Sequence, residues 1–366
     1  MAKFNNEYEY LFHLLACVLK DRQPEEKPDN LDFGRLFAIA KHHSVANIAF
    51  YAVEKLSSGP EPELRNKWSV LRDKAVFREV TQQHEFDVFC NIIREEKMRC
   101  LPVKGIFLKD LYPQRDMRMM SDIDVLFDKE NVDKLRKILP AKGYEADEMD
   151  EEDHDAYLKK PVISIEVHRC LFGHGGEKFA EMFADPWQYA TEISPYIWCL
   201  DKNWFFIYIF AHLEKHYQFA GTGIRSIMDI WVYTNAYKDE LDWDFIYSQF
   251  DKVGSSDFLR DILELCEIWF EGKPATKKSD KMTAYILNSG TFGNYSTMIA
   301  NKQEKKGKLG YALYRIFPPL VEMKPLYPIL RKAPVLLPFM WIARLFSRLV
   351  FRRKKIASEF KELKHD

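Results

Sequence analysis

Residues 121 to 127, SDIDVLF, constrain the fold of this chain most strongly, because acidic and apolar side chains alternate there with a period of two. Successive side chains of a β-strand point to opposite faces of its sheet. Asp122 and Asp124 therefore project from the same face of a predicted strand, with Ser121 at its start. Two carboxylates at this spacing converge on one small volume.

Two further segments predict strands that belong with this one. An apolar run from 100 to 103 ends at Lys104-Gly105 and precedes a predicted helix at 106 to 111, which is the order strand, tight turn, helix. Residues 162 to 168, VISIEVH, alternate again, so that Glu166 and His168 share a strand face. We expect Glu166 to join the two aspartates as a third acid.

Most of the remaining chain carries apolar residues at helical spacing. The predicted helices are 7–20, 31–56, 62–98 (one long helix or a broken pair), 131–139, 203–218, 224–237, 242–252 and 256–271. A predicted hairpin, with strands at 144–146 and 156–160, surrounds the acidic stretch 147–155, which we interpret as a solvated tip.

This order of elements predicts an α+β fold, in which a small mixed sheet is flanked by helical regions. The predicted regions are N-terminal helices at 1–98, the sheet at 99–200, further helices at 201–300, and a basic, proline-rich tail at 301–366.

Composition narrows the class of protein further. The chain has no uninterrupted apolar run of about 20 residues, which predicts that it does not span a membrane. It has no small-residue cleavage site near its start, which predicts that it is not secreted. Its six cysteines are widely spaced, without a CxxC pair. They are typical of reduced thiols in a cytoplasmic protein.

Charge is unevenly distributed along the chain. Residues 302–366 hold 16 Lys/Arg against 5 Asp/Glu, whereas 1–301 hold 38 against 50. Residues 302–308, KQEKKGK, predict a flexible basic linker, and 339–355 predict an amphipathic helix. In that helix Trp341, Leu345 and Leu349 lie opposite Arg344, Arg348 and Arg352. Such a tail fits an anionic membrane surface, an RNA surface, or a helix docked on its own domain.

Three acids around a glycine turn are suited to phosphoryl transfer from a nucleoside triphosphate. A divalent metal neutralises phosphate oxygens, and Mg²⁺ prefers a few carboxylates together with phosphate oxygens and water. Glu166 would complete the metal site or act as a base. The Gly105 turn lets backbone N–H groups approach the phosphates, and Lys104 adds positive charge.

With these motifs the sequence resembles the nucleotidyltransferase superfamily, and within it a bacterial family usually described as uncharacterised nucleotidyltransferases. The matching segments are LPVKGIFLKDLYP, Arg115 and Arg118, MSDIDVLF, KGYE, ISIEVHR and AHLEKHYQFAGTGIRSIMDIWVY. One departure is that the superfamily commonly has Gly-Gly or Gly-Ser where this chain has Lys104-Gly105.

The resemblance implies a nucleotidyltransferase-like palm, dependence on Mg²⁺ (or Mn²⁺), and transfer of a nucleoside monophosphate with release of diphosphate. The implied catalytic and metal-binding residues are Asp122, Asp124 and Glu166. The expected nucleotide-binding residues are Lys104, Gly105, Ser121, Arg118 and Arg225.

Simpler interpretations stand beside several of these roles. Ser121 is suited to capping its own backbone, and Arg225 to a surface ion pair with Asp229 four residues later. His212 and His216 have the spacing of zinc ligands, but LEK between them lacks the metalloprotease pattern. His168 is placed to orient a carboxylate or the acceptor, and partial burial with a backbone partner fits it equally well.

Three functions fit the sequence. The first is a nucleotidyltransferase with an unidentified acceptor. The second is a catalytically weak nucleotide-binding scaffold, held by its tail at the inner surface of the membrane. The third is a toxin-like enzyme that nucleotidylates RNA or a protein. Neither the base nor the acceptor follows from the sequence.

Overall fold

The computed structural model describes residues 6–149, 154–173, 175–324 and 326–351. The chain forms two compact units, residues 1–293 and 294–366. This division reflects the compactness of the chain and does not test the boundaries of the four regions expected from the sequence. Those four regions remain predictions.

The first unit contains a mixed five-stranded sheet, in the order β1-β2-β5-β4-β3. Neighbouring strands pair antiparallel except β2 and β5, which run parallel. The strands are β1 (Leu101–Pro102), β2 (Ile123–Leu126), β3 (Glu145–Met149), β4 (His154–Lys159) and β5 (Ile163–His168). The expected α+β architecture is confirmed.

The two faces of the sheet differ as the alternating sequence requires. Ile163, Ile165 and Val167 of β5 are buried, while Glu166 and His168 are partly exposed. The apolar face packs against α4 and α6 in one core cluster, which also contains Ile123 and Val125 of β2. The acidic face is left for the functional site.

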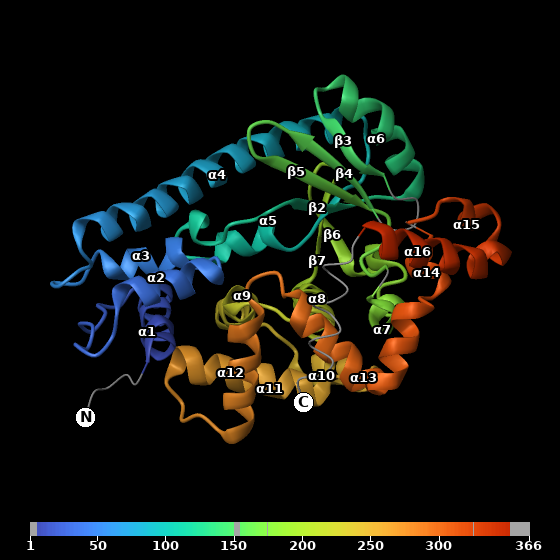
Figure 1. Cartoon of the computed structure of the whole chain (residues 1–366). Helices are drawn as coiled ribbons and strands as arrows, with labels where there is room; N and C mark the ends of the chain where they lie inside the picture. The colour runs from blue at the N-terminus through green and yellow to red at the C-terminus, as the bar shows by residue number, and fades with distance from the viewer. Residues whose placement is uncertain (1–5, 150–153, 174, 325, 352–366) are drawn as a thin grey trace. The chain divides into compact units, whose positions relative to one another are not determined.

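Helices make up most of the rest of this unit (Figure 1). They are α1 (Glu7–Leu19), α2 (Phe33–His42), α3 (Ala46–Val53), α4 (Pro62–Glu95), α5 (Gly105–Leu108), α6 (Lys129–Ala141), α7 (Glu177–Ala180), α8 (Lys202–Phe219), α9 (Ile224–Ala236), α10 (Trp243–Lys252), α11 (Ser256–Cys266) and α12 (Lys277–Ser289). Short 3₁₀ helices cover Lys109–Leu111, Arg115–Met117 and Pro186–Tyr189, and a π-helix covers Glu267–Glu271.

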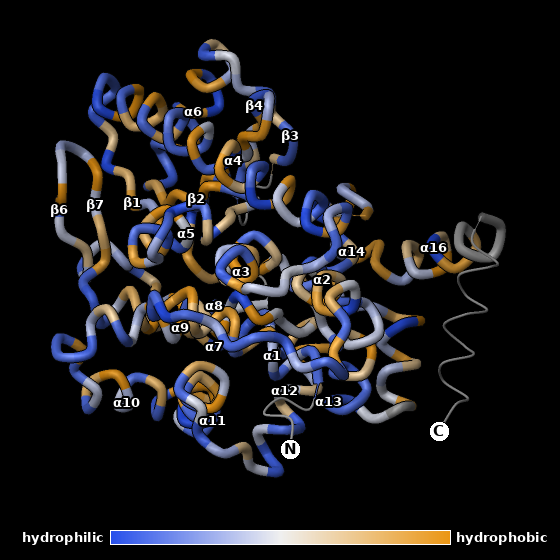
Figure 2. The backbone as a smooth tube through the Cα atoms, turned by 90° about the vertical axis from the view of Figure 1, so that its left-hand side faces the viewer, coloured by the Kyte–Doolittle hydropathy of each residue, from blue (hydrophilic) through white to orange (hydrophobic). Residues whose placement is uncertain are grey.

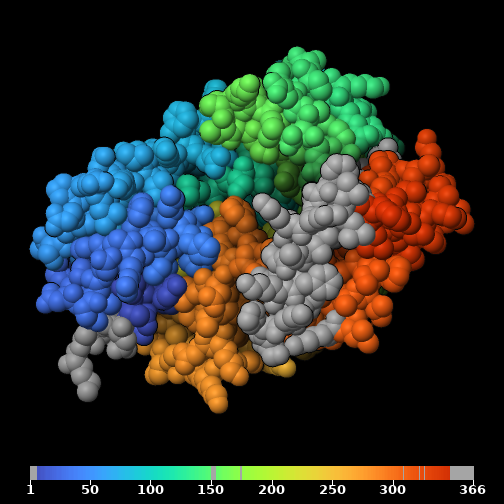
Figure 3. Space-filling view, in the orientation of Figure 1, coloured from blue at the N-terminus to red at the C-terminus, as the bar shows by residue number. Residues whose placement is uncertain are grey.

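Segment 62–98 forms one long helix, α4, rather than a broken pair. It starts with Pro62, whose missing N–H and fixed φ suit the first turn of a helix. Its first half packs on the N-terminal helices, where Trp68 donates from Nε1 to the carbonyl of Ala46 at 2.6 Å. Figure 3 shows α4 continuous with these helices, and in Figure 2 hydrophobic and hydrophilic positions alternate along the helices around the sheet.

The helix predicted at 31–56 is instead two helices, α2 and α3, separated at 43–45. Ser44 adopts a positive φ of 53° there, which interrupts the helical backbone.

A two-stranded hairpin that the sequence did not indicate lies beside β1. Its strands are β6 (Ala190–Ser194) and β7 (Ile197–Leu200). Cys100 joins it to the sheet, because its N–H donates to the carbonyl of Tyr196 and its carbonyl accepts from Trp198, both at 2.8 Å. Residues of β6 are mostly exposed, so no clear alternation marked the strand.

The solvated tip expected at 147–155 is only partly correct. Residues 150–153 lie outside the described residues. Asp155, at the start of β4, is fully buried and accepts hydrogen bonds from Arg136 and Arg169. A buried carboxylate requires such partners, and both arginines are distant from the acidic run in sequence.

The second unit contains α13 (Tyr295–Ile316), α14 (Leu320–Met323), α15 (Ile329–Lys332) and α16 (Leu337–Phe351), with a 3₁₀ helix at Pro334–Leu336. The flexible linker expected at 302–308 is wrong, since this segment lies in α13. Lysine, glutamate and glutamine are good helix formers whatever their charge, and the helix breaks only at Gly307, with φ 70° and ψ 161°.

The faces of α16 also differ from the expected ones. Trp341 packs inside this unit, with Nε1 donating to the carbonyl of Pro318 at 2.7 Å. Arg344, expected on a solvated basic face, is buried and donates to the carbonyl of Arg315. Residues 352–366, which include Arg352, lie outside the described residues. Among the residues that the structure describes, no helix has the length and apolar character needed to cross a bilayer.

Candidate active site

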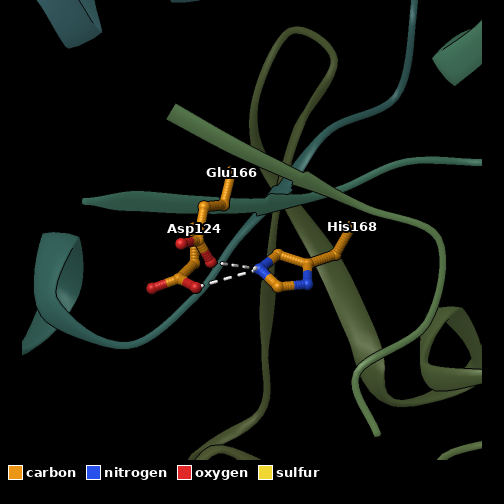
Figure 4. Close-up of side chains that lie close together, drawn as sticks. All are labelled: Asp124, Glu166 and His168. Atoms are coloured by element: carbon orange, nitrogen blue, oxygen red, sulfur yellow. Dashed lines mark hydrogen bonds and ion pairs between the residues drawn. The ribbon is translucent and has the colours of Figure 1, made fainter. Parts of the chain in front are cut away.

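The parallel pairing of β2 and β5 brings distant acids together. Asp124 lies opposite Glu166 in the register of these strands. His168 Nε2 lies 3.0 Å from Oδ1 of Asp124 and 3.3 Å from Oε2 of Glu166 (Figure 4). The possible ligand atoms of these three residues all lie within 4.8 Å of one another. Two residues 42 positions apart in sequence thus share one small polar cluster, which we call the acidic cluster.

Asp122 lies just before β2 and lines the same cavity as the acidic cluster. Burial, together with the negative charges of Asp124 and Glu166, raises the pKa of Asp122 to about 6. Asp122 is therefore electrostatically coupled to the other two predicted acids, Asp124 and Glu166. His168, which the sequence placed only as an orienting group, contacts both carboxylates directly.

Opposing effects set the protonation of the cluster. Burial alone would raise the pKa of Asp124, but the charge of Lys104 and the contact with His168 lower it well below its ordinary value. Burial would also raise the pKa of Glu166, yet its hydrogen bond with His168 lowers that pKa. Burial would lower the pKa of His168, whereas its bonds to the two acids raise it. The two carboxylates and His168 therefore stabilise one another's charged forms.

Lys104 occupies the turn between β1 and α5 in an unusual backbone conformation. Its φ is 54° and its ψ is −120°, a region that favours glycine. Lys104 Nζ donates to Oδ1 of Asp124 at 2.7 Å. The left-handed conformation thus falls on Lys104, and Gly105 is needed for a close approach, because an added Cβ would lie 2.5 Å from the sulfur of Met120.

Two arginines from different segments meet at the carbonyl of Met119. Arg118 donates to it from Nη1 at 2.9 Å, and Arg225 of α9 donates from Nη1 at 3.0 Å. Burial and the nearby charge of Arg118 lower the pKa of Arg225 to about 10. Two cations held this close are typical of a site for an anion.

The surface ion pair expected between Arg225 and Asp229 is wrong. Asp229 is buried and accepts from Nε of Arg118 at 2.8 Å and from the hydroxyl of Tyr112 at 2.7 Å. The helix α9 faces the loop before β2 rather than solvent, so Asp229 finds its partners across this interface.

These groups line a cavity of about 340 Å³ within the first unit. Its walls come from the acidic face of the sheet, the Lys104 turn, α8, α9 and the 291–292 segment. Each predicted site residue lines it, namely Lys104, Gly105, Arg118, Ser121, Asp122, Asp124, Glu166 and Arg225. The structure therefore gathers the whole predicted set around one cavity.

His212 and His216 of α8 also line the cavity, with their Nε2 atoms 3.1 Å apart. Burial lowers the pKa of both, to about 4 for His216, so both are neutral near pH 7. Within the described part of the chain, neither joins a group of three or more possible metal ligands. Sequence reasoning did not single out Tyr208 and Phe292, which line the cavity but have no motif around them.

The acidic cluster fits a divalent cation. It supplies two carboxylates and an imidazole, with the Asp122 carboxylate beside them, a donor set that suits Mg²⁺ or Mn²⁺. Burial, and then the negative charges of Asp124 and Glu166, raise the pKa of Asp122, and a bound cation would offset these negative charges.

A mixed sheet with acids on neighbouring parallel strands, beside a strand, turn and helix, defines a nucleotidyltransferase-like palm. Residues 29–271 match the family described as "Uncharacterised nucleotidyltransferase", and the chain belongs to this family. Membership gives the protein a general function in nucleotidyl transfer. No significant match exists among curated proteins or among solved structures.

Proposed function

We propose that this protein transfers a nucleoside monophosphate from a nucleoside triphosphate to an acceptor hydroxyl. A bond forms between the acceptor oxygen and the α-phosphorus, the bond from that phosphorus to the bridging oxygen breaks, and diphosphate leaves. The observation that carries the proposal is one cavity lined both by the acidic cluster and by Lys104, Arg118 and Arg225. Metal ligands and phosphate-binding cations are the two sets of groups that this reaction needs.

Asp122, Asp124 and Glu166 would hold Mg²⁺, which neutralises charge on the phosphate oxygens when bound. Lys104 and the two arginines bind and orient the phosphates, and Ser121 lies within the same cavity. Glu166, which is partly exposed and favours its ionised form, is placed to accept the proton of the acceptor hydroxyl. His168 fixes the positions of both carboxylates.

The test is a transfer assay with labelled nucleoside triphosphates, Mg²⁺ and cell extract, comparing the wild type with Asp124→Asn. We expect label transfer and diphosphate release to fall by at least about 100-fold, the effect typical of removing one charge-stabilising group. Glu130→Gln, an exposed acid on α6, is the matched control. Activity that persists in Asp124→Asn would exclude this site.

The same assay separates the two alternatives from the sequence. Tight nucleotide binding without diphosphate release, across a broad range of acceptors, would favour a scaffold. Labelled RNA or labelled protein, with growth arrest that Asp122→Asn relieves, would favour a toxin-like enzyme.

A second proposal concerns the C-terminal unit, which we infer contacts an anionic membrane surface. Phe339, Ile342 and Phe346 of α16 are 63%, 54% and 66% exposed at helical spacing, in a region rich in Lys and Arg. Such a stripe is typical of helices that lie in a membrane interface. Replacing all three with serine should abolish cosedimentation with vesicles that contain phosphatidylserine. Equal sedimentation of both proteins would contradict this.

A further inference from the structure

An exposed aromatic side chain lies at the edge of the cavity. Phe292 is 70% exposed, the most exposed of the large apolar side chains described in residues 6–293, and it lines the cavity. Phenylalanine exposed singly on a surface needs no explanation, but here the ring borders a site rich in cations.

The backbone around Phe292 holds the ring in place. Gly290 and Gly293 on either side both have φ 71°, a conformation that side chains disfavour. Thr291 Oγ1 lies 3.2 Å from the carbonyl of His42 and 3.1 Å from Oγ of Ser44. A Cβ on Gly293 would overlap the carbonyl of Ala220, so this segment packs tightly on the loop before α9. Phe292 is thus presented by an ordered turn.

Phe292 also contacts Arg225, one of the proposed phosphate-binding cations. The guanidinium of Arg225 lies over its ring, 5.8 Å from the centroid. Arg225 is the same residue that meets Arg118 at the carbonyl of Met119. A nucleotide joins its phosphates to its base through one ribose, so a ring beside phosphate-binding cations can engage the other half of the ligand.

We propose that Phe292 is the platform on which the nucleobase of the bound nucleoside triphosphate stacks. This inference rests on the proposed function and adds the binding site of the base. Stacking on an aromatic ring is worth about 1–3 kcal/mol per base and tolerates different bases, because each base has a π-face. Phe292 therefore contributes affinity for nucleotides as a class.

The test compares two ligands in the presence of Mg²⁺. One is the ribonucleoside triphosphate that binds the wild type most tightly of the four, and the other is inorganic tripolyphosphate, which has no base. By calorimetric titration, Phe292→Ala should weaken nucleotide binding about tenfold, within the range for one stacked base, and leave tripolyphosphate binding unchanged. Phe292→Trp should retain nucleotide affinity.

Phe77→Ala, which removes another exposed phenylalanine on α4 outside the cavity, is the matched control and should bind both ligands as the wild type does. Unchanged nucleotide affinity in Phe292→Ala would overturn the stacking role. So would an equal loss for both ligands, which would reveal a purely structural effect. A wild type that binds neither ligand would overturn the proposed function as well.

Discussion

Lys104 combines an unusual backbone conformation with a direct contact to the acidic cluster. Its ammonium contacts Asp124, and its backbone adopts φ 54°. Residues held in such sparsely populated conformations persist only where the surrounding structure imposes them. Here β1, α5 and the buried Asp124 fix the turn, so that a lysine adopts a backbone conformation that favours glycine.

Two substitutions of Lys104 separate its charge from its strain. Lys104→Met removes the ammonium partner of buried Asp124, and we expect a loss of about 2–4 kcal/mol in the free energy of unfolding. Lys104→Gly loses the same charge but relaxes the backbone, so it should be more stable than Lys104→Met by about 1 kcal/mol. Urea unfolding measures both.

The matched control is Lys134, an exposed residue inside α6. There glycine should be less stable than methionine by about 0.8 kcal/mol, the ordinary helix preference. The same order at both positions would show that Lys104 stores no strain.

His43 makes stability depend on pH. It is fully buried, and burial together with the charge of His42 lowers its pKa to about 4. The unfolded chain binds the proton with an ordinary pKa of about 6.5, so between pH 6.5 and 4 the unfolded state binds more protons and stability falls as pH falls. His43→Leu should lower this slope by up to about 1.4 kcal/mol per pH unit.

Urea unfolding at pH 7 and at pH 5 measures the slope. Only the difference between wild type and variant is diagnostic, because His212 and His216, whose pKa values are also lowered, act in the same direction. Identical slopes would mean that His43 takes up its proton as readily in the folded chain as in the unfolded chain.

At the scale of elements, one buried network fixes the helical layer on the sheet. Asp229 of α9 holds Arg118, which lies in the loop before β2, and Tyr112. The cavity lies between these elements, so its width depends on this network. Positions on α9 that touch no nucleotide can therefore affect nucleotide binding.

Asp229→Asn should destabilise the protein by about 3 kcal/mol, because Arg118, whose side chain is only 10% exposed, loses its charged partner. The double variant with Arg118→Met should lose less than the sum of the single losses. Asp257→Asn removes an exposed ion pair of α11 and should change stability by less than about 0.5 kcal/mol. Additive losses at 229 and 118 would contradict the network.

At the scale of the whole molecule, residues 1–293 contain every side chain that lines the cavity. The family match, at 29–271, also falls inside this unit. The nucleotide site and the exposed stripe of α16 therefore belong to different units, and their functions should be separable.

We expect residues 1–293, produced alone, to unfold in one cooperative transition and to bind nucleoside triphosphates with the affinity of the full chain. Both core clusters of this unit lie entirely within it. Calorimetric titration and urea unfolding of both proteins measure this. A fragment that folds but binds nucleotide more than about tenfold more weakly would assign the second unit a part in the site.

Several features could be predicted from the sequence because they depend on local order. Alternation in SDIDVLF and VISIEVH gave the acidic strands, and helical spacing gave the long α4. The exposed strand β6 has no such alternation, so the sequence did not indicate it. The high charge of 302–308 predicted a flexible linker where the chain is helical. Local patterns report only which face of an element is apolar.

The sequence by itself determined that Asp124 and Glu166 lie on polar strand faces, because strand periodicity is local. Only the tertiary structure decided that β2 pairs parallel with β5, that Asp229 binds Arg118, and that Phe292 borders the cavity. These contacts join residues distant in sequence, and their choice depends on how whole elements bury apolar surface and satisfy buried charges.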